Sequence, residues 1–346
     1  MTRYLWDTPT SGDGRRADRN RWDRDGFGHL HQVIGAAELA GLDGVVVPYD
    51  PDGDEPWIVA GGALRDTRHT RVVVGFHPAF GTPVYAAKMS LTLQRLGADR
   101  LDWLVHVEAG AEDEVRRGDH LIGAARYERA AEFLTVARGV WSGRGALPGG
   151  FDGGEFDHDG DYFHVAAGGF DEAVDGHPFP TVHLTGTSPE ALALSAAHGD
   201  VHLFTESEHG LWPQVRALGE LAAARGRTVR AGLALPVIAR EDEDEAWARV
   251  LRLWRETDPA ATEDEVRSRG LGDLRFDGFD RIGYRTPIGL VGSYRQVARR
   301  LADYVAGGID TFVLSGHPAI EEVHRAGEHL LHLADPAGRT LTGARA

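Results

Sequence analysis

The segment that decides the fold is Gly307-Gly308-Ile309-Asp310-Thr311-Phe312-Val313-Leu314-Ser315-Gly316-His317-Pro318. Its middle, residues 309–314, is a short apolar run bounded by glycines, which predicts a strand buried on both faces. Residues 321–333 behind it carry apolar side chains at helical spacing. If the earlier strands are of the same kind, this strand closes a parallel barrel. The turn Ser315-Gly316-His317 then lies at the carboxyl-end rim, where barrels of this type carry their chemistry.

Seven further apolar runs precede this one along the chain. We expect strands at residues 3–8, 43–47, 70–76, 101–107, 181–185, 201–204 and 229–237. A segment with helical spacing follows each run, and regular alternation of strand and helix predicts βαβ units in a parallel sheet. The predicted fold class is therefore α/β, a (β/α)8 TIM barrel with insertions in the loops at the carboxyl ends of the strands.

Three stretches interrupt this rhythm, and we interpret them as insertions in a single domain that covers residues 1–335. They are residues 108–122, 145–169 and 258–287. The second is rich in Gly, Asp and His, with one hairpin-like piece at residues 162–165, and the third is irregular and charged. Insertions of this length are places where lids are found. Residues 336–346 are expected to form a C-terminal tail.

The composition excludes several classes of protein. The 53 acidic and 37 basic residues give a formal net charge of −16, which argues against nucleic acid and anionic membranes as partners. The chain has no cysteine, so disulfides, thiolate metal sites and cysteine nucleophiles are excluded. Its first residues are charged where a signal peptide needs an apolar run, and no apolar stretch approaches the roughly 20 residues of a membrane helix. We therefore expect a cytoplasmic protein.

Barrel geometry directs the search for functional residues to the carboxyl ends of the predicted strands. Residues with polar or aromatic side chains at these ends include Trp6, Asp7, His77, His106, Glu108, Glu206 and His317. We assign Trp6, Asp7 and His77 to a substrate pocket. No pair of histidines and carboxylates has the usual spacing of a metal site on one helix or strand, so we expect no metal. For any single histidine, a hydrogen-bonded structural side chain is the alternative interpretation.

A turn from strand to helix, Gly186-Thr187-Ser188-Pro189, is a candidate anion site. Such a turn can offer free backbone N–H groups and two hydroxyls to a phosphate. The alternative is an ordinary Ser/Thr helix cap, and the residues alone do not decide between the two. No G-x-G-x-x-G follows the first strand and the chain has no Walker loop, which argues against a dinucleotide fold or an NTPase. Arg285 is either an anion clamp on a lid or a surface arginine.

Short motifs spread over nearly the whole chain occur together and in order. They are Pro9-Thr10 with Gly12-Asp13-Gly14, Gly44 to Pro48 with Trp57 to Ala60, Thr92 to Leu96, Arg126-Tyr127-Glu128, Gly186-Thr187-Ser188, Val237-Ile238 with Arg240-Glu241, and Gly308 to Gly316. As a set they resemble the bacterial luciferase-like flavin monooxygenases, and the branch that they resemble most is that of the alkanesulfonate monooxygenases.

This resemblance implies a cofactor and its binding site. It implies reduced FMN supplied by a separate reductase, with O2 as co-substrate in a flavin peroxide. It also implies a homodimer or homotetramer packed through barrel helices. The flavin phosphate would lie near Tyr127 and the turn of Gly186, Thr187 and Ser188. The ring edge would lie near His106, where the family usually has asparagine.

Departures from the sulfonate branch concern the substrate. The branch carries an arginine and a histidine on its seventh strand, where this chain has Leu233 to Pro236. Its tryptophan after the sixth strand corresponds to Glu206 here, and its tyrosine in the last turn corresponds to His317. An anion in a dry site needs a compensating charge, so these changes should weaken the binding of a sulfonate. We expect a small organic substrate other than a simple alkanesulfonate.

The predicted function is a two-component, FMNH2-dependent monooxygenase that uses O2 and meets its flavin reductase transiently. His317 is the predicted acid or base, because histidine titrates near neutral pH. Glu206 is predicted to orient an amine or hydroxyl of the substrate, and Arg285 to clamp an anion. One alternative is a deazaflavin-dependent oxidoreductase of the same barrel family, which needs no oxygen. The other is a non-catalytic flavin-binding barrel.

Overall fold

The computed structural model describes residues 2–13, 19–108, 118–143, 156–170, 174 and 176–338, and the side chains of its first helix from residue 26 onward. Large parts of the first two predicted insertions, and the end of the predicted tail, lie outside the described residues. These parts are residues 109–117, 144–155 and 339–346.

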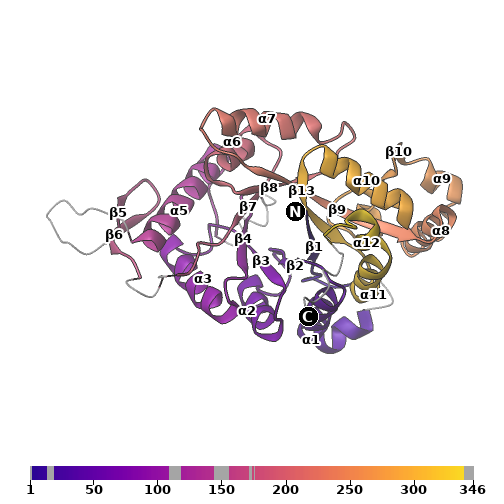
Figure 1. The fold of residues 1–346 in the computed structure, drawn as a ribbon, viewed down its shortest axis with the longest axis horizontal. Coiled ribbons are helices and arrows are strands. Elements are labelled where there is room, and N and C mark those ends of the chain that lie inside the picture. The colour runs from indigo at the N-terminus through magenta and orange to yellow at the C-terminus, as the bar shows by residue number, and fades with distance from the viewer. Residues whose placement is uncertain are drawn as a thin grey trace, which may run out of the picture. The chain divides into compact units, whose positions relative to one another are not determined.

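Strands and helices alternate along the described chain (Figure 1). The parallel strands with the predicted positions are β1 (Arg3–Asp7), β2 (Gly44–Val47), β3 (Arg71–Phe76), β4 (Leu101–Val105), β7 (Val182–Thr185), β8 (Val201–Thr205), β9 (Arg230–Arg240) and β13 (Ile309–Ser315). Their hydrogen-bonded order is β9-β13-β1-β2-β3-β4-β7-β8, and β8 also pairs with β9. An order that returns to its first strand is that of a closed barrel, so the predicted (β/α)8 barrel is confirmed.

A helix follows each of these strands. These helices are α1 (Arg19–Leu39), α2 (Pro56–Asp66), α3 (Pro83–Gly97), α5 (Ala124–Ser142), α6 (Pro189–His198), α7 (Trp212–Ala223), α8 (Glu243–Trp254) and α11 (Ala319–Arg325), which continues through the π-helix η3 (Ala326–Leu330) into α12 (Leu331–Ala334). A further helix, α10 (Tyr294–Ala306), precedes β13. Helices α2, α3 and α6 start with proline at their first position. The residue before each proline, Glu55, Thr82 or Ser188, caps the helix with a side chain that accepts a backbone N–H of the first turn. Local sequence thus sets these helix starts.

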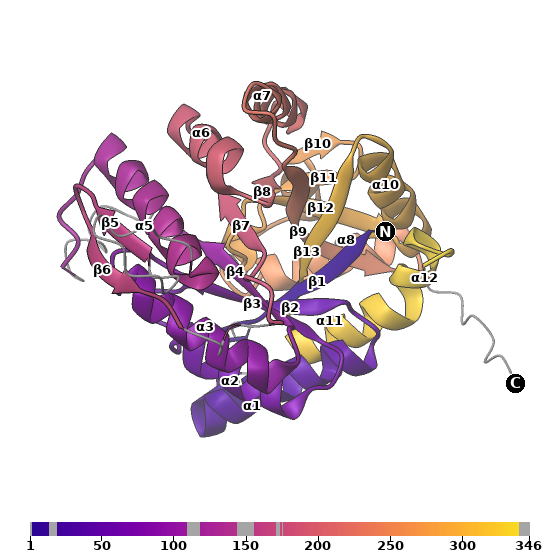
Figure 2. The same ribbon diagram turned by 60° about the vertical axis from the view of Figure 1, so that its left-hand side comes forward.

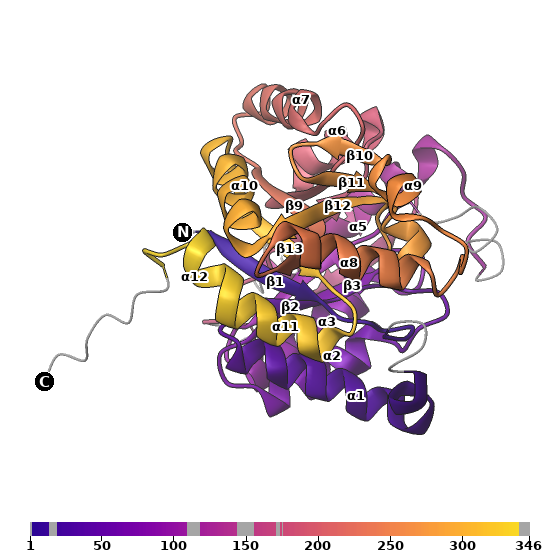
Figure 3. The same cartoon turned by 90° about the vertical axis from the view of Figure 1, so that its right-hand side faces the viewer.

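The chain folds as two compact units, and unit one comprises Met1–Val46, Phe204–Trp212 and Arg230–Ala346. In this unit β1 lies between β13 and β2, and Tyr4 on β1 stacks on Phe312 of β13 with ring centroids 5.3 Å apart. Helices α1 and α11 pack side by side (Figure 1, Figure 3). The core of unit one therefore joins the first and last strands of the chain.

An extension of the sheet in unit one was not predicted. Strand β9 pairs with β13 through its first half and with β12 (Ile288–Ser293) through its second, from Val237 to Arg240. β12 in turn pairs antiparallel with β11 (Arg275–Asp277), and β11 with β10 (Gly270–Gly272), beside α8 and α9 (Glu263–Arg267) (Figure 3). The prediction that residues 258–287 are irregular is therefore wrong.

Unit two comprises Val47–Leu203 and Pro213–Val229. Its parallel strands β3, β4 and β7 pair in register, with Val74 opposite Trp103 and Trp103 opposite Val182. Outside them lies an aromatic cluster in which Trp103 meets Phe76 edge-to-face at 5.1 Å. The hairpin of β5 (Phe156–Asp159) and β6 (His164–Gly168) lies against α5 (Figure 2), so the hairpin predicted around residues 162–165 is confirmed.

Candidate functional site

The first cluster of polar side chains lies in unit one, around the carboxylate of Asp13. Asp13 stands in the loop after β1 and is 1% exposed. Its Oδ1 lies 2.9 Å from Nδ1 of His317, and its Oδ2 lies 2.8 Å from Nε2 of His29. The backbone N–H of Ala319 donates to both oxygens. One carboxylate thus ties together the loop after β1, helix α1 and the start of α11.

The protonation of this cluster follows from the chemistry of Asp13. Burial raises the pKa of Asp13, but hydrogen bonds with His29, His317 and the backbone of Ala319 outweigh it and lower the pKa from 3.8 to about 2. The ionised carboxylate only accepts hydrogen bonds, so in the neutral His317 ring Nδ1 carries the hydrogen. Nε2 of His317 is then the nitrogen that can take up and release a proton.

His317 is fixed by contacts besides Asp13. Its backbone N–H donates to the hydroxyl of Tyr284 at 3.1 Å, and the two rings lie 4.6 Å apart. Arg249 donates from Nη2 to the carbonyl oxygen of His317 at 2.9 Å. The side chain nevertheless keeps 16% of its surface exposed, so the ring is both oriented and reachable.

Arg285 and Asp7, two predicted site residues, lie close together in unit one. Nε of Arg285 lies 3.9 Å from Oδ2 of Asp7, and its Nη2 donates to the hydroxyl of Thr10 at 3.2 Å. The positive charge of Arg285 is thus shared with a carboxylate, which weakens its attraction for an anionic substrate. The anion-clamp role of Arg285 stays a prediction.

Glu206, which follows β8, is engaged within unit one. Its Oε1 accepts the hydroxyl of Tyr304, and its Oε2 lies 3.5 Å from Nη1 of Arg275. Burial and the hydrogen bond to Glu206 raise the pKa of Tyr304, so the phenol keeps the proton that it donates. A role of Glu206 on the substrate stays a prediction.

The second cluster lies in unit two, where α5 and α6 begin. Tyr127 is in the first turn of α5 and Ser188 caps α6, and their hydroxyl oxygens are 2.9 Å apart. Both hydroxyls donate to Oε1 of Glu108, which follows β4, and the distance from Ser188 is 2.8 Å. The structure thus brings together Tyr127 and Ser188, and it adds a carboxylate. The role of this pair in binding a cofactor stays a prediction.

The turn before α6 requires glycine. Gly186 has a φ of +113°, and a Cβ there would lie 2.7 Å from Cβ of Ala191. The carbonyl oxygen of Gly186 accepts a hydrogen bond from Nε2 of His202 at 3.1 Å, while Nδ1 of His202 lies 2.7 Å from Oγ of Ser195. A buried histidine therefore holds the turn, and Thr187 next to it stays exposed.

His77 and His106 both lie near Tyr49 in unit two, with ring centroids 6.2 Å and 6.1 Å from the tyrosine ring. His77 also lines a cavity of about 350 Å³. The walls of this cavity are mainly aromatic and include Tyr49, Trp57, Phe76, Phe80, Tyr85 and Phe133. A volume of this size is in the range of small-molecule sites. The assignment of His77 to a substrate pocket is compatible with this cavity and stays a prediction.

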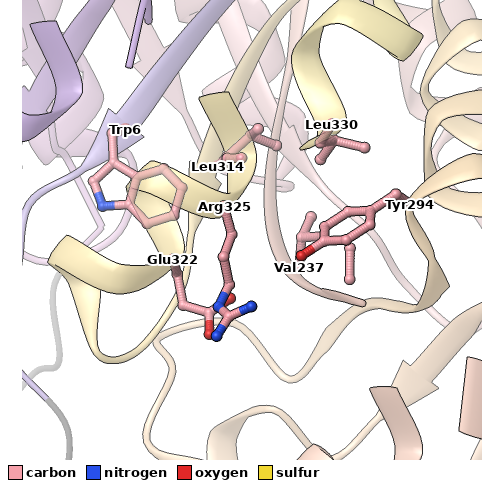
Figure 4. A pocket seen from close by; sticks show the side chains of 9 residues that line it. Trp6, Val237, Tyr294, Leu314, Glu322, Arg325 and Leu330 are labelled. Carbon is pink, nitrogen blue, oxygen red and sulfur yellow. The ribbon is translucent and has the colours of Figure 1, made fainter. Parts of the chain in front are cut away.

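Trp6 lies elsewhere, in the interior of unit one. It is 2% exposed and, with Leu314 and Glu322, lines a cavity of about 20 Å³ (Figure 4). A volume of that size holds about one water molecule. The cavity beside Trp6 is therefore too small for an organic substrate. The substrate contact of Trp6 stays a prediction.

The free energy of unfolding is expected to fall as the pH is lowered from about 6.5 to 4, because of His77 and His202. Burial, the main cause, lowers the pKa of both histidines from 6.5 to about 4. In this window the unfolded chain binds protons that the folded chain excludes. Each ring then removes up to about 1.4 kcal/mol of stability per pH unit, and the full contribution is present only above the unfolded-state value.

Urea unfolding at about pH 7 and about pH 5 measures this effect. We compare the wild type with His202→Gln and, as a control, with a variant of the exposed His209, His209→Gln. His202→Gln is expected to lose less stability than the wild type on acidification, and the control to lose as much. An equal loss in His202→Gln and the wild type would contradict the assignment.

Three side chains hold these clusters together: Asp13, Glu108 and His202. From the sequence, Glu108 was named only as a residue at a strand end and Asp13 only as part of a motif, and none of the three was given a role. Asp13 and Glu108 lie in loops that follow predicted strands, and this position could have marked them as site residues. His202 lies inside β8, where both faces are buried and no pattern separates a structural histidine from an apolar residue.

Within the described ranges, no group of three or more His, Asp or Glu side chains is arranged so that it could hold a metal ion. In the same part of the chain, no helix combines the length and the apolar character needed to cross a lipid bilayer.

Comparison with solved structures shows a common fold over nearly the whole chain. A riboflavin lyase with modified FMN and substrate riboflavin is 21% identical, covers 100% of this chain and 94% of its own, and gives a TM-score of 0.77. The EDTA monooxygenase from Chelativorans sp. BNC1 is 18% identical, with 97% and 94% covered and a TM-score of 0.74. An F420-dependent secondary alcohol dehydrogenase is 14% identical, with 96% and 99% covered and a TM-score of 0.66.

Comparison with protein families shows the family to which the chain belongs. The model of the luciferase-like monooxygenases matches residues 3–311, from the first strand of the barrel into the last. The match includes the Asp13 loop, the Tyr127 helix and the Ser188 turn. With this match over most of its 346 residues, the chain belongs to the luciferase-like monooxygenases, a family of oxidoreductases.

Proposed function

We propose that this protein is a two-component monooxygenase that takes reduced FMN from a separate reductase and uses O2 to oxidise a small organic substrate. The observation that carries the proposal is the pair of hydroxyls of Tyr127 and Ser188, 2.9 Å apart at the N-terminus of α6. The resemblance to flavin monooxygenases predicted the phosphate of FMN at this place.

The donor set at the start of α6 suits a phosphate. Two hydroxyls converge there, the helix N-terminus favours negative charge, and the glycine at position 186 leaves room for close approach. The carboxylate of Glu108 does not suit a phosphate, because it accepts both hydroxyl protons. The residues fit the phosphate of FMN once Glu108 turns away.

When bound, the reduced flavin supplies the electrons for the reaction with O2. The residues of the chain bind, orient and move protons. Tyr127 and Ser188 would hold the phosphate by their hydroxyls. Asp13 orients His317 through Nδ1, and His317 would exchange a proton with the substrate through Nε2.

Two arginines of unit one, Arg240 and Arg285, lie beside carboxylates, which supports a substrate without a sulfonate group. Arg240 is buried and makes two hydrogen bonds to Glu322, at 2.6 Å and 3.0 Å, and Arg285 lies beside Asp7. The side chains that line the 350 Å³ cavity in unit two include one carboxylate, that of Glu55, and neither lysine nor arginine. Aromatic walls with a carboxylate and without a positive charge suit a largely apolar molecule that is not an anion.

Oxygen uptake tests the proposed function. The protein is mixed with FMN, NADH and a flavin reductase, and oxygen consumption and oxidised products are measured with a panel of apolar substrates. We expect substrate oxidation that requires reduced FMN and O2. Hydride transfer to a deazaflavin without oxygen would support the alternative of an F420-type oxidoreductase, whose fold the chain shares. FMN binding without turnover of any substrate would support a non-catalytic barrel.

Two partners are part of the proposal. The reductase is expected to meet the protein only transiently, since reduced flavin can diffuse between the two. A homodimer or homotetramer is expected from the family resemblance, and light scattering of the purified protein measures its mass.

A further inference from the structure

The side chain of Glu108 in unit two contacts two hydroxyls at once. A single carboxylate oxygen, Oε1, accepts the hydroxyls of both Tyr127 and Ser188. Ser188 also accepts the backbone N–H of Ala191 in the first turn of α6. The serine and tyrosine hydroxyls have one proton each, and each hydroxyl donates to this oxygen of Glu108, while their own oxygens lie 2.9 Å apart.

The tyrosine keeps that proton. Burial first, and then the hydrogen bond to Glu108, raise the pKa of Tyr127, and the charge of Glu190 acts in the same direction. The two hydroxyls are thus neutral donors whose hydrogens point at one negative oxygen near the positive end of α6. A phosphate oxygen of a bound flavin would make the same contacts.

A phosphate and the carboxylate cannot share these donors. Each hydroxyl has one hydrogen, and two anions at hydrogen-bond distance of the same hydroxyls repel each other strongly. Glu108 is an exposed side chain, so it can turn into solvent without leaving a buried charge unpaired.

We propose that Glu108 is an internal competitor for the flavin phosphate: it occupies the Tyr127–Ser188 pair in the ligand-free protein and must leave when a phosphate-bearing flavin binds. The inference rests on the proposed function and deepens it, since it names the residue that sets the preference between phosphorylated and unphosphorylated flavins. Displacement of Glu108 weakens the binding of FMN, whereas riboflavin, which has no phosphate, does not need these donors.

Flavin binding to the variant Glu108→Gln tests the proposal. The fluorescence of FMN and of riboflavin is titrated with the purified protein, and a dissociation constant is obtained for each. The amide is uncharged and nearly equal in size, so it binds the hydroxyls less strongly and does not repel a phosphate. We expect FMN to bind about tenfold more tightly to Glu108→Gln than to the wild type, because a like charge has been removed. Riboflavin should bind equally to both.

Glu190→Gln is the matched control. Glu190 lies in the first turn of α6 and acts on Tyr127 by its charge, but the structure gives it no hydrogen bond to Tyr127 or Ser188. We expect a much smaller gain in FMN affinity from this variant. A second variant, Glu108→Ala, should reproduce the gain of Glu108→Gln.

Three results would overturn the proposal. The first is equal FMN affinity of the wild type and both Glu108 variants, and the second is an equal gain for FMN and riboflavin. The third is a gain as large in Glu190→Gln. In each of these cases flavin still binds, so the proposed function stands while the role of Glu108 fails. If neither flavin binds to any of the proteins, both fail.

Discussion

Replacing His317 by glutamine is expected to lower kcat by a factor of about 10² to 10⁴, which is the usual contribution of a positioned acid or base. Nε2 of His317 is the nitrogen left for proton exchange, because Nδ1 donates to the ionised Asp13 at 2.9 Å. Glutamine can still donate a hydrogen bond to Asp13, but it does not titrate. The fold of the last turn should therefore survive while proton transfer is lost.

The measurement is steady-state turnover at saturating substrate, followed across the pH range. We expect kcat of His317→Gln to be lower than that of the wild type at every pH measured. His324→Gln is the control, because His324 is exposed on helix α11, which begins just after His317. Affinity for FMN should be unchanged in both variants. A kcat of His317→Gln within about twofold of the wild type would show that His317 is not the acid or base.

Replacing Arg240 by methionine is expected to destabilise the folded protein by about 3 to 5 kcal/mol. Arg240 and Glu322 are each 7% exposed in their side chains and form a bidentate pair at 2.6 Å and 3.0 Å. Methionine fills a similar volume but leaves the Glu322 carboxylate buried without its partner. Burying an unpaired charge costs far more than a surface ion pair contributes.

Urea or thermal unfolding of three variants tests this explanation. The double variant Arg240→Met/Glu322→Leu should regain much of the lost stability, because two apolar side chains can replace a buried ion pair. Arg252→Met, at an exposed position of α8, should change the unfolding free energy little. If the double variant is no more stable than Arg240→Met, the cost does not come from the orphaned carboxylate.

The barrel was predictable because its strands are buried on both faces. Such strands are continuous apolar runs, as in Val45-Val46-Val47 of β2, and they stand out from the amphipathic helices between them. Strand β12 escaped prediction because glycines interrupt its apolar run at positions 289 and 292. A Cβ at Gly289 would lie 2.4 Å from the carbonyl oxygen of Pro236, so the glycine is needed for close packing against β9.

The candidate site was predictable only in part. Residues that follow strands could be found from the barrel alone, and Tyr127 and Ser188, 61 positions apart, are close in space as the family resemblance requires. The partners of these residues could not be found. Asp13 and His317 are 304 positions apart, and no local pattern connects them. Glu206 follows a strand as expected, but its contact with Tyr304 depends on a helix near the end of the chain.

A crystal structure of the protein with FMN bound tests the central claim most directly. The claim is that the hydroxyls of Tyr127 and Ser188, at the start of α6, hold the flavin phosphate. We predict phosphate oxygens within hydrogen-bond distance of both hydroxyls, with the carboxylate of Glu108 turned away from them. FMN bound with its phosphate elsewhere, and Glu108 still joined to Tyr127 and Ser188, would contradict the account.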